Sequence, residues 1–142
     1  MILPDVNLLV YAHDETARHH ASARAWWYEQ LNGARMVGLA WVVVLGFIRL
    51  VTNRQICQSP YAPSEALEIV GTWLSQPHVR IIHPSEDHFR LVSKLIAEIG
   101  AAGNLTTDAH LAALAIERGL VLHTTDADFA RFKSLKWRNP VQ

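Results

Sequence analysis

The sequence predicts an α/β protein in which a central parallel β-sheet is flanked by helices on both faces. Short apolar segments alternate with longer segments of helical periodicity along the 142 residues, which is the order of elements in such proteins. The apolar segments show no clean alternation of polar and apolar residues, as expected for strands buried on both faces. Since the chain has no repeat or linker, we expect residues 1–142 to form a single domain.

The first half of the chain is predicted to contain two strands and four helices. Its first residues form a buried strand that ends at Asp5, where the chain turns into a helix. A helix with an aromatic face is expected at residues 17–31. A strand at residues 36–39 precedes a segment at 41–52 that is apolar nearly all round, which predicts a buried helix. The two prolines that follow punctuate a loop before a helix at 64–75.

The second half continues the same alternation, with breaks at glycine and proline. The expected elements are a strand at 77–83, helices at 85–99 and 106–118, a strand at 120–124, and a short last helix that begins around 125–129.

Composition excludes several classes of protein. Half of the residues are hydrophobic, which excludes a disordered chain. No apolar run approaches the roughly 20 residues that cross a bilayer, and the N-terminal segment lacks the features of a signal peptide. We therefore expect a cytoplasmic protein without membrane contact. The lone Cys57 argues against an internal disulfide and against a cysteine zinc site.

Three carboxylates are predicted to meet at one edge of the sheet. Asp5 and Asp126 each follow a predicted strand, and Asp108 lies in the first turn of a helix that can point at the same edge. The functional crevice of an open α/β sheet lies beyond the carboxyl ends of its strands. Converging carboxylates repel one another unless a cation neutralises them, and oxygen ligands suit Mg²⁺ or Mn²⁺. This arrangement favours metal-assisted phosphodiester hydrolysis.

Neighbouring residues are candidates to support these carboxylates. If the chain is locally extended, Asn7 and Thr124 share a face with the aspartate two positions away and would orient the ligands. Asp128 is a peripheral candidate. Taken singly, each aspartate is explained by a helix cap, a helix dipole or an Asx turn. Taken together, they favour a metal site.

Three ordered segments resemble one family across nearly the whole chain. They are LPDVNLL at 3–9, NLTTDAHLAALA at 104–115 and TTDADF at 124–129. These segments resemble the PIN-domain ribonuclease toxins of the VapC type. The resemblance implies a PIN-like fold, Mg²⁺ or Mn²⁺, RNA cleavage, homodimerisation and a cognate VapB-type antitoxin.

One position departs from the family pattern. The family places an acidic residue, usually Glu, in a helix three residues before an arginine. In the matching segment 41–49, Arg49 is present but Gly46 stands at the acidic position. Glycine inside a helix costs roughly 1 kcal/mol relative to alanine, so the local sequence gains nothing from it. We expect a detoxified or naturally weakened enzyme, in which Arg49 is a charge partner for the carboxylates.

Several other functions compete with this one. A catalytically silent module that binds RNA or an antitoxin remains open, because Gly46 removes a ligand. A phosphorylated receiver-like domain would need paired acidic residues after the first strand, and a dehalogenase-like phosphatase would need Asp-x-Asp where the chain has Asp5-Val6-Asn7. The eight histidines show no pairing at zinc-ligand spacing.

A basic segment near the C-terminus supplies the only local patch for RNA, since the formal net charge is zero. Two aromatic residues, Phe132 and Trp137, interleave with its four basic residues. The segment is either a solvated tail or an edge that contacts phosphates. The basic residues are Arg131, Lys133, Lys136 and Arg138.

Overall fold

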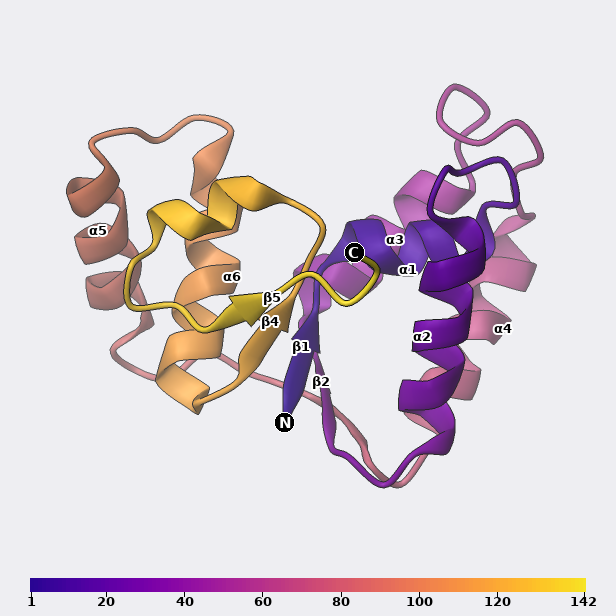
Figure 1. Ribbon diagram of the computed structural model, residues 1–142, viewed down its shortest axis with the longest axis horizontal. Helices are drawn as coiled ribbons and strands as arrows, with labels where there is room; N and C mark the ends of the chain where they lie inside the picture. Colours follow the sequence, from indigo (N-terminus) through magenta and orange to yellow (C-terminus); the bar gives the residue numbers. More distant parts are fainter.

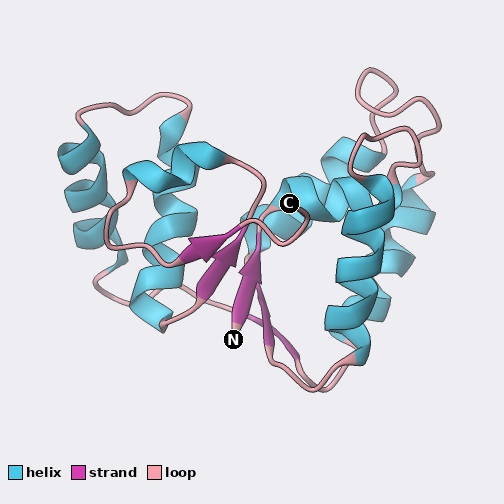
Figure 2. Ribbon diagram, in the orientation of Figure 1, coloured by secondary structure: helices cyan, strands magenta, loops and turns pink.

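The computed structural model describes all 142 residues and confirms the predicted α/β class. A five-stranded sheet, in the order β3-β2-β1-β4-β5, has every neighbouring pair of strands parallel. Helices lie on both sides of it (Figures 1 and 2). The strands are β1 (Ile2–Pro4), β2 (Val37–Leu39), β3 (Val79–Ile81), β4 (Val121–His123) and β5 (Trp137–Arg138).

Six α-helices and one 3₁₀ helix connect the strands. Helices α1 to α4 lie on one side of the sheet, and α5 and α6 lie on the other (Figure 1). None of them is long and apolar enough to span a membrane. They are α1 (Val6–His13), α2 (His20–Asn32), α3 (Trp41–Val51), α4 (Pro63–Leu74), α5 (His88–Ile99), α6 (Leu105–Arg118) and the 3₁₀ helix η1 (Ala127–Arg131).

The central strand β1 brings the two ends of the chain together. It pairs with β4 in the register Ile2 to Val121, Leu3 to Leu122 and Pro4 to His123. Leu3 and Leu122 are completely buried, because helices cover both faces of these strands. The residues that follow β1 and β4 therefore emerge side by side at the carboxyl edge of the sheet.

Helix α3 is less buried than its sequence predicts. Val43, Val44 and Phe47 enter the core, but Trp41 is 47% exposed and Leu45 is 60% exposed. The expectation of a fully buried helix is therefore wrong. An apolar surface need not be covered within one chain, and only one side of α3 packs against this molecule.

The C-terminal segment is part of the fold and not a free tail. Strand β5, which the sequence did not predict, pairs with β4 through Trp137 opposite Leu122 and Arg138 opposite His123. Phe132 is 2% exposed and belongs to the core, so it is not a platform on which bases stack. The four basic side chains of the segment remain exposed.

Candidate active site

Asp5 joins the end of β1 to the start of α1. Its Oδ1 accepts a hydrogen bond from the backbone N–H of Val6 at 2.7 Å, and its Oδ2 accepts one from the Thr124 hydroxyl at 2.7 Å. Its own N–H donates to the His123 carbonyl at 2.9 Å. The aspartate is thus a helix cap, as the simpler interpretation held, and it is also a buried, fixed carboxylate with 8% exposure.

Thr124 links two of the predicted site residues. Its side chain is completely buried. The hydroxyl donates to Asp5 and accepts from the backbone N–H of Asp126 at 3.0 Å. Pro4 pairs with His123 in the register of β1 and β4. Asp5 follows Pro4 and Thr124 follows His123, so the register explains this contact.

Asp126 caps η1, and its Oδ1 accepts from the backbone N–H of Asp128 at 2.8 Å. This is an Asx turn, which is one of the structural roles that the sequence predicts for an aspartate taken singly. Asp126 is partly buried and Asp128 is exposed. Asp126 therefore lies at the site, while Asp128 lies at its solvent edge.

Asp108 lies in the first turn of α6, is partly buried, and has no hydrogen-bond partner for its carboxylate among the protein side chains or backbone. Burial is the main cause that raises its pKa to about 6, and the charges of Asp126, Asp5 and Asp128 add to the shift. Burial likewise raises the pKa of Asp5, although its bonds to Thr124 and Val6 oppose the rise. The structure thus gathers Asp5, Asp108 and Asp126 at one edge of the sheet, where each disfavours ionisation of another.

The donors at this edge suit a hard divalent cation, since all of them are oxygens. No group of three His, Cys, Asp or Glu side chains is arranged so that it could hold one ion directly. Mg²⁺ commonly keeps several water ligands and uses only one or two carboxylates. The residues therefore fit such an ion by the chemistry of their donors, with water as the remaining ligands.

Two predicted supporting residues are placed differently from what the sequence predicts. Asn7 is the second residue of α1, so the chain is not extended between it and Asp5, and the reason given for placing Asn7 on the carboxylate's face is wrong. Its side chain lines a hollow that also includes Tyr11 and Arg18. Arg49 is exposed and forms no ion pair. It is not a charge partner of the carboxylates, because it lies on the solvent side of α3.

Gly46 lies beside the start of α1. A Cβ atom built on Gly46 would stand 3.3 Å from Cγ2 of Val6, the residue directly after Asp5. A longer side chain at position 46 would therefore start next to the carboxylate edge, and Val6 would have to shift by a few tenths of an ångström. The structure places no acidic group there.

A second polar cluster, which the sequence did not indicate, joins α5 to α6. The Glu117 carboxylate accepts from the backbone N–H and the hydroxyl of Ser85, each at 3.0 Å, and contacts Nδ1 of His88 at 2.9 Å. Nε2 of His88 lies 2.8 Å from Nδ1 of His110. The residues that contact one another in this cluster are 22 to 32 residues apart in the sequence, so no local pattern predicts the cluster.

Comparison with known proteins places the chain in a family. The PIN domain family matches residues 2–135. Ribonuclease VapC33 of Mycobacterium tuberculosis is 39% identical over 142 residues, covering 100% of this chain and 99% of that protein. Ribonuclease VapC43 of the same organism is 39% identical over 141 residues, covering 99% of this chain and 96% of that protein.

Solved structures share the fold at lower identity. VapBC2 from Rickettsia felis, bound to a DNA fragment from its promoter, has a TM-score of 0.70 at 22% identity and covers 98% of both chains. Mycobacterium tuberculosis VapC20, a toxin that cleaves the sarcin–ricin loop, has a TM-score of 0.68 at 18% identity, with 92% of this chain and 93% of that chain covered. Together with the curated relatives, these matches show that the chain belongs to the VapC ribonucleases of the PIN domain family.

Proposed function

We propose that this chain is a metal-dependent endoribonuclease, the toxin of a toxin–antitoxin pair, whose site consists of Asp5, Asp108 and Asp126. The observation that carries the proposal is the placement of these carboxylates: Thr124 donates to Asp5 and accepts from the N–H of Asp126. The charges of Asp5 and Asp126 reach Asp108, where they add to the burial that raises its pKa to about 6. Acidic groups held together in this way are costly for folding, and such perturbed groups concentrate at functional sites. Mg²⁺ or Mn²⁺ is the proposed cofactor.

Each residue has a definite task in this proposal. Thr124 fixes the rotamer of Asp5 by donating to Oδ2, and it orients the turn at Asp126 by accepting from that residue's N–H. Asp108 has no protein donor and is free to bind a cation or, near its pKa of about 6, a proton. A bound divalent ion would lower the pKa of a coordinated water and so supply the nucleophile for phosphodiester hydrolysis.

The exposed basic residues of the C-terminal segment are proposed to contact RNA phosphates. Arg138 lies on β5, directly beside β4, which leads into Thr124 and Asp126. Arg131 ends η1, the helix that Asp126 caps. Phosphate contacts of this kind position a nucleic acid without reading its bases. This interpretation replaces that of a free tail.

A protein partner is part of the proposal. VapBC2 from Rickettsia felis and VapBC-1 from Haemophilus influenzae, which share the fold, are complexes by name. We propose that this chain likewise binds a VapB-type antitoxin, which would bring an apolar helix and a basic side chain to the acidic edge. We also propose a homodimer. The exposed apolar side of α3, with Trp41 and Leu45, gives it a candidate surface.

Gly46 weakens the enzyme in this proposal, because it leaves the acidic edge one carboxylate short beside Val6. The same observation favours the second candidate, a catalytically silent module that keeps only the binding of RNA or antitoxin. Metal binding and metal-dependent cleavage separate the two functions.

The test compares the wild-type chain with Gly46→Glu and with Gly46→Gln, which has the same size and no charge. Each protein is assayed on a mixed structured RNA with Mn²⁺, with Mg²⁺ and with EDTA, and Mn²⁺ binding is measured by calorimetry. We expect Gly46→Glu to bind Mn²⁺ more tightly and to cleave faster than both of the others. EDTA should abolish the cleavage.

Two results would contradict this expectation. If Gly46→Glu and wild type bind Mn²⁺ equally well and neither cleaves RNA, the silent module is the better description. If no version binds Mn²⁺ or Mg²⁺, the carboxylates do not form a metal site. Asp108→Asn provides the negative control for cation binding at this edge.

A further inference from the structure

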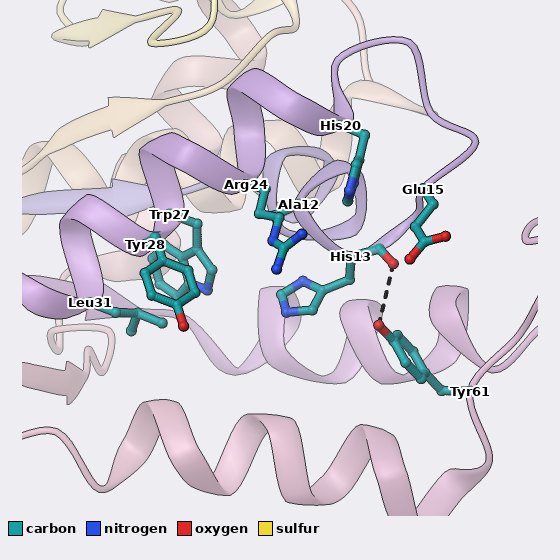
Figure 3. Close-up of a pocket in the computed structure, with 9 residues that line it drawn as sticks. All are labelled: Ala12, His13, Glu15, His20, Arg24, Trp27, Tyr28, Leu31 and Tyr61. Carbon is teal, nitrogen blue, oxygen red and sulfur yellow. Dashed lines mark hydrogen bonds between the residues drawn. The ribbon is translucent and has the colours of Figure 1, made fainter.

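A polar cavity lies between the end of α1, the inner side of α2 and Tyr61 (Figure 3). Its volume is about 270 Å³, near the lower limit of small-molecule sites. None of the site carboxylates lines it. The polar and aromatic side chains around it are His13, Glu15, His20, Arg24, Trp27 and Tyr28.

Arg24 is the positive group of this cavity and has no protein partner. It forms neither an ion pair nor a hydrogen bond within the chain, and its guanidinium lies next to the His13 ring in Figure 3. Burial is the main cause that lowers the pKa of His13; the hydrogen bond to Leu9 opposes it, and the charges of His20 and Arg24 add to the lowering. The cavity is thus a place where an anion would relieve repulsion.

The two histidines that line the cavity leave the same ring nitrogen unpaired. Nδ1 of His13 lies 2.8 Å from the Leu9 carbonyl, and Nδ1 of His20 lies 2.8 Å from the Tyr11 carbonyl. Because a carbonyl oxygen only accepts, each Nδ1 must carry the hydrogen. Nε2 is left without a partner in both rings. It accepts a hydrogen bond when the ring is neutral and donates one when the ring is protonated.

Glu15 and Tyr28 complete a mixed set of groups. Glu15 forms no ion pair with Arg24 or with either histidine, so its carboxylate is available to hydroxyl donors. Tyr28 follows Arg24 by one helical turn, lies on the same side of α2, and is 63% exposed. Its ring offers a face to a planar group beside the guanidinium.

We propose that this cavity binds a ribonucleotide. Arg24 contacts the phosphate, for which arginine is well suited, and His20 lies beside it. The carboxylate of Glu15 and Nε2 of neutral His13 accept hydrogen bonds from the ribose hydroxyls. Tyr28 stacks on the base. A free anion such as phosphate would satisfy only the first of these contacts, and it would meet the negative charge of Glu15.

The ribonucleotide site is separate from the carboxylate edge. Asp5 caps the first turn of α1 and His13 is its last residue. Because an eight-residue helix is about 12 Å long, the two sites lie at opposite ends of α1. Binding in the cavity therefore does not depend on the proposed nuclease function.

The test is calorimetric titration with AMP and, separately, with inorganic phosphate, both in EDTA so that no divalent ion holds a phosphate at the carboxylates. We expect saturable binding of AMP, tighter than that of phosphate. Arg24→Gln should weaken AMP binding about tenfold or more, since a charge-assisted contact is lost. Arg18→Gln, which removes an exposed arginine outside the cavity, should leave it unchanged.

Three further variants distinguish a nucleotide from a simple anion. Glu15→Gln should weaken binding of AMP and strengthen binding of inorganic phosphate, because it removes both a hydroxyl acceptor and a repulsive charge. Tyr28→Phe should retain AMP affinity, while Tyr28→Ala should lose about threefold to tenfold. Far-ultraviolet circular dichroism confirms that each variant is folded.

The proposal is wrong if AMP shows no saturable binding, or if Arg24→Gln and Arg18→Gln weaken it equally. It is also wrong if Glu15→Gln strengthens AMP and phosphate to the same extent, because the site would then recognise only charge. Retention of AMP binding by Asp108→Asn would show that the cavity, and not the carboxylate edge, is the site.

Discussion

Helix α6 carries two acidic side chains with opposite surroundings. Near its end, the Glu117 carboxylate is held by Ser85 and His88 through three contacts of 2.9 to 3.0 Å, and the side chain is 7% exposed. Near its start, Asp108 has no protein donor, and neighbouring carboxylates add to the burial that raises its pKa to about 6.

The contrast separates a structural charge from a functional one. Glu117 is satisfied within the fold by Ser85 and His88. Asp108 is kept in an environment that disfavours its charge, which natural proteins tolerate where a ligand or a reaction needs the group. Of the two acidic residues on α6, only Asp108 lacks protein partners, and it is the one proposed to bind a cation.

The largest expected effect is on catalysis. Asp108→Asn should reduce metal-dependent RNA cleavage by more than the roughly 10- to 100-fold that loss of an outer-shell partner costs, because a proposed ligand is removed. The assay uses whichever background, wild type or Gly46→Glu, cleaves faster. Glu117→Gln should change the rate by less than about threefold, since Glu117 contacts no site residue. Equal losses of cleavage rate in Asp108→Asn and Glu117→Gln would contradict the distinction between a functional and a structural carboxylate.

The next effect is on stability. Glu117→Ala should lower the free energy of unfolding by about 2 kcal/mol, because the N–H of Ser85 and the ring of His88 lose a buried acceptor. Urea unfolding followed by circular dichroism measures the change. Glu117→Gln keeps one acceptor and should lose less. A change below about 0.5 kcal/mol for Glu117→Ala would mean that the cluster does not hold α5 to α6.

A smaller effect on stability is a gain, in contrast to the loss expected for Glu117→Ala. The pKa of Asp108 is higher in the folded chain than its ordinary value of 3.8, so ionisation costs stability as the pH rises through about 6. Asp108→Asn removes that cost and should stabilise the chain by about 1 kcal/mol at pH 7.5, allowing for partial exposure. The gain should vanish below about pH 4, where the carboxyl is protonated in both states.

Unfolding curves at pH 4, 6 and 7.5 test this dependence. Asp128→Asn removes the same charge from an exposed position and should give a smaller gain at pH 6 and 7.5. A gain for Asp108→Asn that does not change between pH 4 and 7.5 would show that the repulsion among the carboxylates is not its cause.

The smallest expected effect concerns Gly46. Alanine gains about 1 kcal/mol over glycine inside a helix, but its Cβ would stand 3.3 Å from Val6. We expect Gly46→Ala to change stability by less than about 0.5 kcal/mol because the two effects oppose one another. In a Val6→Ala background the contact is relieved, and the same substitution should stabilise. Absence of that difference would mean that Val6 does not limit position 46.

Much of the fold could be predicted because its signals are local. The strands around Leu3 and Leu122 are short apolar runs, and Gly119 ends α6 with a positive φ of 67°, as a helix-terminating glycine does. Asp5 and Asp126 were placed correctly relative to the sheet because strand ends in a parallel sheet share an edge. The contact between Thr124 and Asp5 follows from the same register.

The remaining features depend on packing that no local pattern reveals. Asn7 was misplaced because the helix starts directly after Asp5, and Arg49 because α3 exposes one side. Strand β5 has only two residues, too few for a recognisable pattern. The contacts of Glu117 reach 32 residues along the chain, and the cavity at Arg24 needs three segments to form.

The register of β1 and β4 has a consequence for protein synthesis. The Thr124 hydroxyl that fixes Asp5 lies 119 residues further along the chain, and β4 must be made before β1 can pair with it. The first 124 residues must therefore be synthesised before Thr124 can fix Asp5 and the two halves of the acidic edge can meet.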